Sequence, residues 1–305
     1  MNKQITEKTK CTGCGACVMV CTHNAIKMQG DAEGFLYPII DNDKCVECNT
    51  CVNVCNARQS CGVVNRESCY VVQGRDNKSR RASSSGGIFG EIARKWIELG
   101  GYVYGASFDY ALNVEHICVK EIDKLHLIQK SKYVQSNLKN TFYEVKKLLN
   151  MNKMVCYSGT PCQIAGLKAF LGKNYDNLLC IDVICQGVPG PLVWKKHIER
   201  LGKGERITEF DFRCKDEGWN HLCISYKHNN NKCLVDFEND CYLRAFDETE
   251  ILRECCYSCM FRGKKGYSDI TLGDCWGYDE IVGTKSDNIG SSVVIINTIR
   301  SEERR

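Results

Sequence analysis

The sequence predicts an α+β protein in two parts. A small cysteine-rich module is followed by a larger mixed α/β domain with a β-rich C-terminal part. Three observations lead to this class. Of the 305 residues 23 are cysteine, and two regularly spaced cysteine runs lie near the N-terminus. After them, short apolar runs that end in glycine-containing loops alternate with runs at helical spacing. From Ile207 onward, strand-like runs prevail.

The composition is that of an ordinary globular chain, with 43% hydrophobic and 26% charged residues, which excludes a disordered one. Apolar runs stay far below the ~20 residues of a membrane span, and the polar start, Met1–Lys10, lacks the apolar core of a secretory signal. We therefore expect a cytoplasmic protein, where excess cysteine points to metal ligation or redox chemistry rather than disulfides. A formal charge of +4 without a basic cluster gives no indication of nucleic-acid binding.

The two cysteine runs have the spacing of a two-cluster ferredoxin. Both follow C-x2-C-x2-C-x3-C, and three thiolates two residues apart can reach three irons of one cubane, while the fourth ligates the neighbouring cluster. The predicted ligands are Cys11, Cys14, Cys17 and Cys55 for cluster one, and Cys45, Cys48, Cys51 and Cys21 for cluster two. Zinc also takes four thiolates, but its sites usually pair C-x2-C units across a longer gap. We therefore predict a ferredoxin-like module with two 4Fe–4S clusters over residues 1–60.

The segments after the first cysteine run predict a hairpin, a linker and the start of the larger domain. Residues 25–40 read as a β-hairpin with turns at Gly30-Asp31 and Gly34. Residues 61–82 are polar and basic and read as a linker, in which Cys69–Val72 could be a strand. The larger domain spans residues 83–305 and opens with Ser83–Gly87, ahead of a helix predicted at 88–99 and a strand at 102–108. A Ser/Gly turn before a helix suits phosphate, although such serines are more often N-caps.

Two strand–loop–helix units follow, strand 153–157 with helix 164–171 and strand 178–184 with helix 193–201. Their loops carry Cys162 and Cys185, which we expect near each other because loops at the carboxyl ends of strands line one crevice. The strands predicted next are 207–213, 222–227, 233–238, 269–273 and 293–298. Cys256 and Cys259 form a third C-x2-C motif. A four-cysteine metal site needs two further ligands, and the loop cysteines Cys162 and Cys185 are the natural candidates. The neighbouring Cys255 leaves open a shift of this assignment by one residue.

Along nearly its whole length the chain resembles the coenzyme F420 hydrogenase/dehydrogenase beta subunits, in the bacterial form with a fused N-terminal ferredoxin. The matching motifs are Ser83–Gly87, Ser131–Ser136, Gly159–Gln163, Ile184–Gly187, Cys256-x2-Cys259 and Ser268–Asp274. The resemblance implies a flavin-binding domain that holds FAD beside a third 4Fe–4S cluster on Cys162, Cys185, Cys256 and Cys259. It also implies flavin contacts from Ser85, Gly86, Gly87, Lys132 and Tyr133, although Lys132 could equally be a solvated surface lysine. Gln186 departs from the pattern, because many bacterial members have His there.

The predicted function is that of an iron–sulfur flavoprotein oxidoreductase. It would pass electrons between a two-electron donor or acceptor at FAD and one-electron carriers, with a redox protein or a small redox carrier as partner. The alternatives are a non-catalytic electron-transfer subunit without flavin, and a dithiol reductase that uses Cys255 and Cys256 or Cys162. No nucleophile triad or carboxylate pair stands out, and we expect Asp269 and Asp274 to bond backbone rather than to transfer protons. A nicotinamide fingerprint is absent, which disfavours direct use of NAD(P)H.

Overall fold

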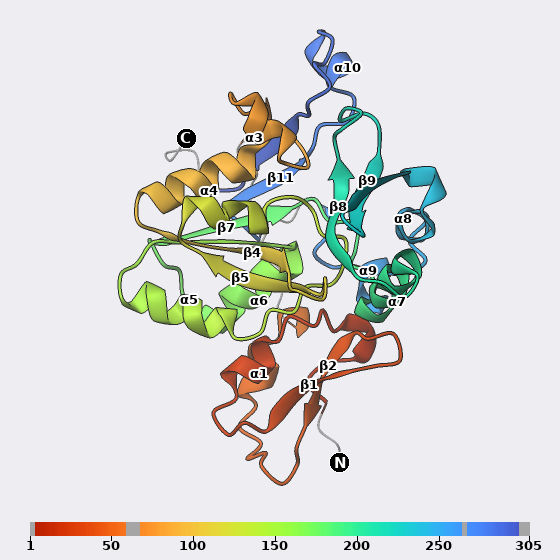
Figure 1. Cartoon of the computed structure of the whole chain (residues 1–305). Coiled ribbons are helices and arrows are strands. Elements are labelled where there is room, and N and C mark those ends of the chain that lie inside the picture. Colours follow the sequence, from red (N-terminus) through yellow and green to blue (C-terminus); the bar gives the residue numbers. More distant parts are fainter. Residues whose placement is uncertain (1–3, 59–67, 264–266, 299–305) are drawn as a thin grey trace.

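The structure, a computed structural model, describes residues 4–58, 68–263 and 267–298 (Figure 1). Residues 4–58 form the N-terminal module, which lies against one side of the larger domain. Its elements are η1 (Lys8–Lys10), α1 (Ala16–Val20), β1 (Ile26–Gly30), β2 (Leu36–Ile40), α2 (Thr50–Asn53) and η2 (Asn56–Arg58). Strands β1 and β2 pair antiparallel and form the predicted hairpin, in which Gly34 adopts a φ of 83° that disfavours other residues.

The larger domain is built on a seven-stranded mixed sheet with the strand order β3-β12-β11-β7-β6-β4-β5. Its strands are β3 (Ser68–Val72), β4 (Tyr102–Phe108), β5 (Val114–Val119), β6 (Val155–Gly159), β7 (Leu178–Val183), β11 (Ile270–Asp274) and β12 (Ser292–Ile296). Strands β4, β6, β7 and β11 run parallel, and antiparallel strands close both edges. Strand β3 comes from the segment predicted as a linker, so part of that segment belongs to the sheet.

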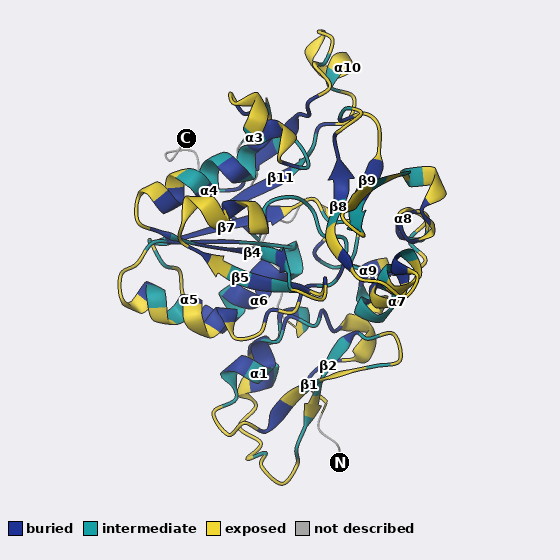
Figure 2. Ribbon diagram, viewed as in Figure 1, coloured by how far each residue is buried: buried dark blue, intermediate teal, exposed yellow. Residues whose placement is uncertain are grey.

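Helices cover both faces of this sheet. Helices α3 (Asn77–Arg81), α4 (Ile88–Glu98) and η3 (Ile122–Ile128) lie on one side, and α5 (Thr141–Asn150) and α6 (Pro161–Leu171) on the other (Figure 1). The core beneath α5 and α6 also contains Ala16 and Met19 of α1, so the module shares a hydrophobic core with the larger domain. Figure 2 shows buried residues concentrated along the sheet and the inner helix faces.

A second, three-stranded antiparallel sheet forms the β-rich part, with the order β10-β9-β8. It comprises β8 (Ile207–Cys214), β9 (Cys223–His228) and β10 (Asn231–Asp236), and packs with α7 (Pro191–Gly202), η4 (Phe237–Asn239) and α8 (Cys241–Asp247) around Trp194. Asn229 and Asn230 both have positive φ, which makes the two-residue turn between β9 and β10. Helices α9 (Glu254–Tyr257) and α10 (Tyr278–Val282) complete the described elements.

The predicted α+β class is confirmed, and the predicted strands and helices are present with ends moved by a few residues. Helix α6 begins at Pro161 rather than at residue 164 because Thr160 and Gln163 form a capping box around its first turn. None of the described helices is long and apolar enough to cross a membrane.

Candidate functional site

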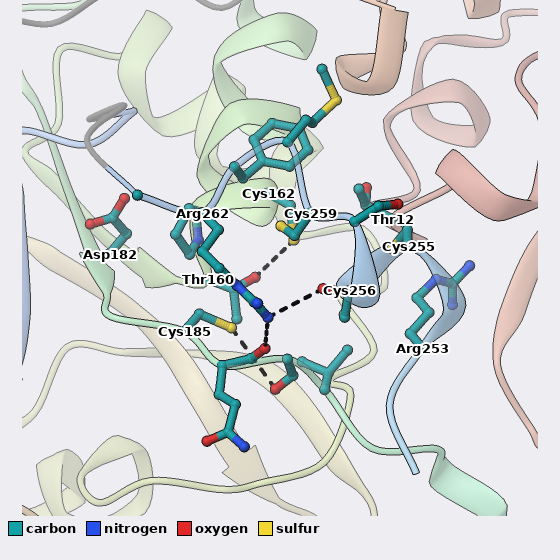
Figure 3. A pocket seen from close by; sticks show the side chains of 18 of the residues that line it. Thr12, Thr160, Cys162, Asp182, Cys185, Arg253, Cys255, Cys256, Cys259 and Arg262 are labelled. Atoms are coloured by element: carbon teal, nitrogen blue, oxygen red, sulfur yellow. Dashed lines mark hydrogen bonds between the residues drawn. The ribbon is translucent and has the colours of Figure 1, made fainter. Parts of the chain in front are cut away.

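Thiols from three separate stretches of the chain line one cavity of about 640 Å³ (Figure 3). We call the four predicted ligands among them the quartet: Cys162, Cys185, Cys256 and Cys259. Cys162 lies in the first turn of α6 after β6, and Cys185 follows the neighbouring parallel strand β7. The expected proximity of these two cysteines is therefore confirmed, and it follows from the shared carboxyl edge of β6 and β7.

Short-range contacts fix the loops that carry the quartet. The hydroxyl of Thr160 lies 3.1 Å from the sulfur of Cys162. The Arg262 guanidinium donates to the carbonyl oxygens of Gln186 and Cys256, which ties the β7 loop to α9. Gly187 allows close packing there, since a Cβ would lie 2.6 Å from the Leu252 side chain. The side chain of Gln186 points elsewhere and donates to the carbonyls of Phe246 and Asp247 at the end of α8.

The thiols of the quartet are electrostatically coupled. Burial raises the pKa of Cys162 well above its usual value, and the neighbouring thiolates of Cys185, Cys256 and Cys259 raise it further. Burial likewise raises the pKa of Cys185 to about 12, with a contribution from Cys256 and Cys259. Cys162 and Cys185 therefore cannot ionise beside the other two thiols unless a cation compensates the charge, which a bound metal centre does.

The pKa values of Cys255 and Cys256 shift in opposite directions. The Cys255 thiol donates a hydrogen bond to Cys256, which lowers the pKa of Cys256 and raises that of Cys255. Cys256 is therefore the readier thiolate of the vicinal pair, and this favours Cys256 over Cys255 as the ligand.

The arrangement of the quartet bears on whether it would hold a single ion or a cluster. In the part of the chain that the structure describes, no group of three or more His, Cys, Asp or Glu residues is placed to hold one metal ion. Thiolates on one zinc lie ~4 Å apart, because each Zn–S bond is about 2.3 Å. A cubane carries each thiolate on a different iron and needs a wider arrangement. The donor set thus suits a 4Fe–4S cluster better than zinc.

The cysteines predicted for cluster one also lie together in the N-terminal module. Burial raises the pKa of Cys17, and the thiolates of Cys14, Cys11 and Cys55 add to this effect. In the group predicted for cluster two, Cys21 and Cys51 belong to one apolar group around Ile26. Cys45 is half-buried, and Cys48 is exposed and accepts a hydrogen bond from the Thr50 hydroxyl.

The module meets the quartet directly. Thr9, Lys10, Thr12 and Ala57, which flank predicted cluster-one ligands, line the same cavity as the quartet. Asn56 donates a 2.7 Å hydrogen bond to the carbonyl oxygen of Cys162. Helix α6 approaches so closely that a Cβ on Gly166 would lie 2.9 Å from the sulfur of Cys14. The predicted cluster-one loop and the quartet are therefore neighbours across the module boundary.

A second cavity of about 780 Å³ adjoins the first. Both cavities are lined by Thr160, residues 183–188 and Arg262, so the Cys185 loop is their common wall. The volume of the second cavity is within the range of known cofactor sites. Of the predicted flavin contacts, Ser85, Gly87, Lys132 and Tyr133 line this cavity. Gly86 does not, because it packs beneath the turn and donates its N–H to the Ser292 hydroxyl.

The turn before α4 leaves backbone donors free of any side-chain cap. Gly87 is the N-cap residue, with a φ of 87° and no capping side chain. The hydroxyls of Ser83 and Ser85 donate instead to the carbonyls of Ser79 and Ser291, and the Ser84 hydroxyl accepts from the Ser131 N–H. The interpretation of these serines as N-caps is therefore wrong, and the first turn of α4 can accept an anionic group.

Lys132 is partly buried rather than a solvated surface lysine. Its ammonium donates to the carbonyls of Leu127, Gln129 and Lys130, and burial lowers its pKa to about 7. It therefore shapes the loop that lines the second cavity.

Arg213 also lines the second cavity, although no sequence motif includes it. One of its guanidinium nitrogens donates to Asp274 at 2.6 Å and to the Tyr133 hydroxyl at 3.2 Å. The second terminal nitrogen, Nη2, is buried without a hydrogen-bond partner among the described residues. Asp274 thus binds a side chain rather than backbone as expected, whereas Asp269 accepts from the Cys180 N–H as expected. No sequence signal distinguishes Arg213, near the end of β8, from the other arginines and lysines of the chain.

Comparisons with known proteins agree with this architecture. The family profile for the C terminus of the coenzyme F420 hydrogenase/dehydrogenase beta subunit matches residues 152–304, and the profile described as "4Fe-4S dicluster domain" matches residues 10–58. The fold is similar to a chain of the xenon-derivatised F420-reducing NiFe hydrogenase complex from Methanosarcina barkeri. The TM-score is 0.53 and the identity 14%, over 79% of this chain and 78% of that chain.

No curated protein matches the sequence. The dicluster match supports iron–sulfur clusters in the module and hence a role in electron transfer. The other profile match extends over half of the sequence and includes every residue of the quartet. The chain therefore belongs to the coenzyme F420 hydrogenase/dehydrogenase beta subunit family, with an N-terminal 4Fe–4S dicluster domain.

Proposed function

We propose that the chain is an iron–sulfur flavoprotein oxidoreductase that binds FAD in the second cavity and a third 4Fe–4S cluster on the quartet. The observation that carries the proposal is the shared wall between the two cavities, formed by Thr160, residues 183–188 and Arg262. A redox cofactor in the second cavity would then lie across this wall from the thiolate ligands in the first.

The residues of the second cavity fit FAD by their chemistry. The uncapped first turn of α4 suits a pyrophosphate, and the unpartnered Nη2 of Arg213 suits an acceptor atom of the cofactor. Cations outnumber carboxylates in the lining, with Lys130, Lys132, Arg213 and Arg262 against Asp247 and Asp274. Bound FAD supplies the exchange between paired and single electrons that clusters alone cannot perform.

A spatial series of the predicted ligands supports the proposal. The second cavity adjoins the quartet, the quartet adjoins the cluster-one loop through Asn56 and Gly166, and the cluster-two loop carries the exposed Cys48. Exposure at that end suits exchange with a redox protein or a small one-electron carrier. Thr12 and Asn56, which lie between predicted cluster one and the quartet, are buried and hydrogen-bonded to each other, which helps to hold that spacing fixed.

Anaerobic purification with iron and flavin counting tests the proposal. We expect about twelve irons and one FAD per chain, four irons for each cluster. About eight irons without flavin would contradict it and favour a non-catalytic electron-transfer subunit. A dithiol reductase would instead show a thiol, such as that of Cys255, whose alkylation abolishes activity without loss of iron.

A further inference from the structure

Arg253 is a fully buried cation at the boundary between the module and the quartet. Its exposed fraction is 0%, and it immediately precedes α9, the helix that carries Cys256. Its Nε donates to the carbonyl oxygen of Cys11 at 2.7 Å, and its two other nitrogens donate to Gln135 Oε1 at 2.8 Å and to the Leu36 carbonyl at 3.0 Å. One side chain thus joins the cluster-one loop, the hairpin and the quartet helix.

In the described part of the chain, no carboxylate is hydrogen-bonded to Arg253 or forms an ion pair with it. Within the described ranges, every hydrogen-bond acceptor of its guanidinium is neutral, and the group stacks over the rings of Tyr37 at 4.1 Å and Phe35 at 5.4 Å. By contrast, the two other buried arginines among the described residues form ion pairs, Arg80 with Asp287 and Arg213 with Asp274. A buried lysine can lose its proton, but an arginine keeps its charge.

Burying such an uncompensated charge is costly, so a nearby anion is expected. The strongly anionic groups expected at this location are the clusters themselves, because four thiolates around a 4Fe–4S core leave a net negative charge that grows on reduction. Arg253 lines the quartet cavity and bonds to the backbone of the first cluster-one ligand. The cluster-one loop approaches Arg253 closely at Gly13. A Cβ at this position would lie 3.0 Å from the Arg253 guanidinium and 2.7 Å from the Gln135 side chain.

We propose that Arg253 is the shared counter-cation of cluster one and the quartet cluster, and that its charge makes both easier to reduce. It is a positioning residue that also sets reduction potentials, through charge and through hydrogen bonds to a ligand loop. The part that concerns the quartet rests on the function proposed above, whereas the part that concerns cluster one rests on the N-terminal module alone.

The test is a potentiometric titration of the anaerobic holoprotein with dithionite, followed by electron paramagnetic resonance of each cluster. Arg253→Met removes the charge and keeps an apolar side chain of similar length. A unit charge about 8 Å away, at an effective dielectric constant of ~20, changes an equilibrium by more than tenfold. At a potential that half-reduces cluster one in the wild type, we therefore expect the reduced-to-oxidised ratio to fall at least about tenfold, with little change at cluster two.

Two further variants separate charge from packing. Arg253→Lys keeps the charge but loses the fork of hydrogen bonds, so the titration should return most of the way to wild type although thermal stability falls. Gln135→Glu places a carboxylate of the same size on Arg253, at the loss of the hydrogen bond that the Gln135 amide donates to the Thr12 carbonyl, so cluster one should shift in the same direction as in Arg253→Met. This variant decides the matter if Arg253→Met fails to fold or to retain iron.

Lys8→Met is the matched control. Lys8 also stacks over Tyr37, at 4.7 Å, but it is exposed and paired with Asp31, so its removal should leave all titrations unchanged. The proposal is overturned if Gln135→Glu and any folded Arg253→Met titrate as wild type, or if cluster two shifts as far as cluster one. An iron count of about eight would refute the third cluster but not the effect on cluster one.

Discussion

Gly166→Ala tests whether the module is docked as closely on α6 as the structure shows. The new methyl group would lie 2.9 Å from both the Cβ and the sulfur of Cys14, and 3.5 Å from the Phe142 ring. Cys14 is buried, and if it ligates cluster one as predicted, its side chain is not free to rotate away. Overpacking of this kind costs about 3 kcal/mol at the upper end of its range, while replacing a helical glycine by alanine returns ~1 kcal/mol.

We therefore expect a net loss of about 2 kcal/mol in the free energy of unfolding. Thermal unfolding of the anaerobic holoprotein, followed by circular dichroism, should show a midpoint several degrees lower, and the resonance spectrum of cluster one should change. Gly202→Ala is the control, since a Cβ there meets the Ile207 side chain at an ordinary 3.8 Å. If Gly166→Ala is as stable as this control and keeps the native spectrum, the docking of α6 on Cys14 is refuted.

Three further predictions address the quartet, the second cavity and a buried histidine. Cys162→Ser should remove about four irons per chain and leave the module's resonance signals, and an unchanged iron count would refute the quartet. Gly86→Ala should weaken FAD binding about tenfold or more while iron is retained, because its Cβ would lie 2.7 Å from the Ser292 nitrogen and the Val72 oxygen; flavin retained as in the wild type would contradict this. Burial lowers the pKa of His116 to about 4 from an unfolded value near 6.5. Between these pH values only the unfolded state binds a proton on this histidine. The free energy of unfolding should therefore have its full value above pH ~6.5 and be about 2 kcal/mol lower at pH 5. In urea unfolding His116→Gln should lack this component, and an equal loss in both proteins would contradict the assignment.

Much of the fold was predictable because local signals were strong. The hairpin at residues 25–40, the helix α4 and the strand β4 follow from turn residues and from apolar periodicity. The proximity of Cys162 and Cys185 was predictable because parallel neighbouring strands end at one edge. The possible strand at Cys69–Val72 is confirmed as β3, but the sequence did not show that it joins the main sheet, since this requires β12 as a partner.

The sequence by itself determined the chemistry available to this protein. Cysteine spacing defines the dicluster module, since ligands for one cubane can be close in the chain. It also marks the third C-x2-C, but not which of Cys255 and Cys256 is the better ligand. That choice depends on the hydrogen bond between the two thiols, which only the folded helix α9 creates.

The tertiary structure alone decided how the parts are joined. Arg213, Arg253 and Gly166 carry no local signal, because each acts on partners that are dozens to hundreds of residues away in the chain. The cost of burying an arginine depends on what surrounds it after folding, and the freedom of a glycine depends on what packs against it. Such effects arise from contacts between distant segments, which spacing and periodicity do not encode.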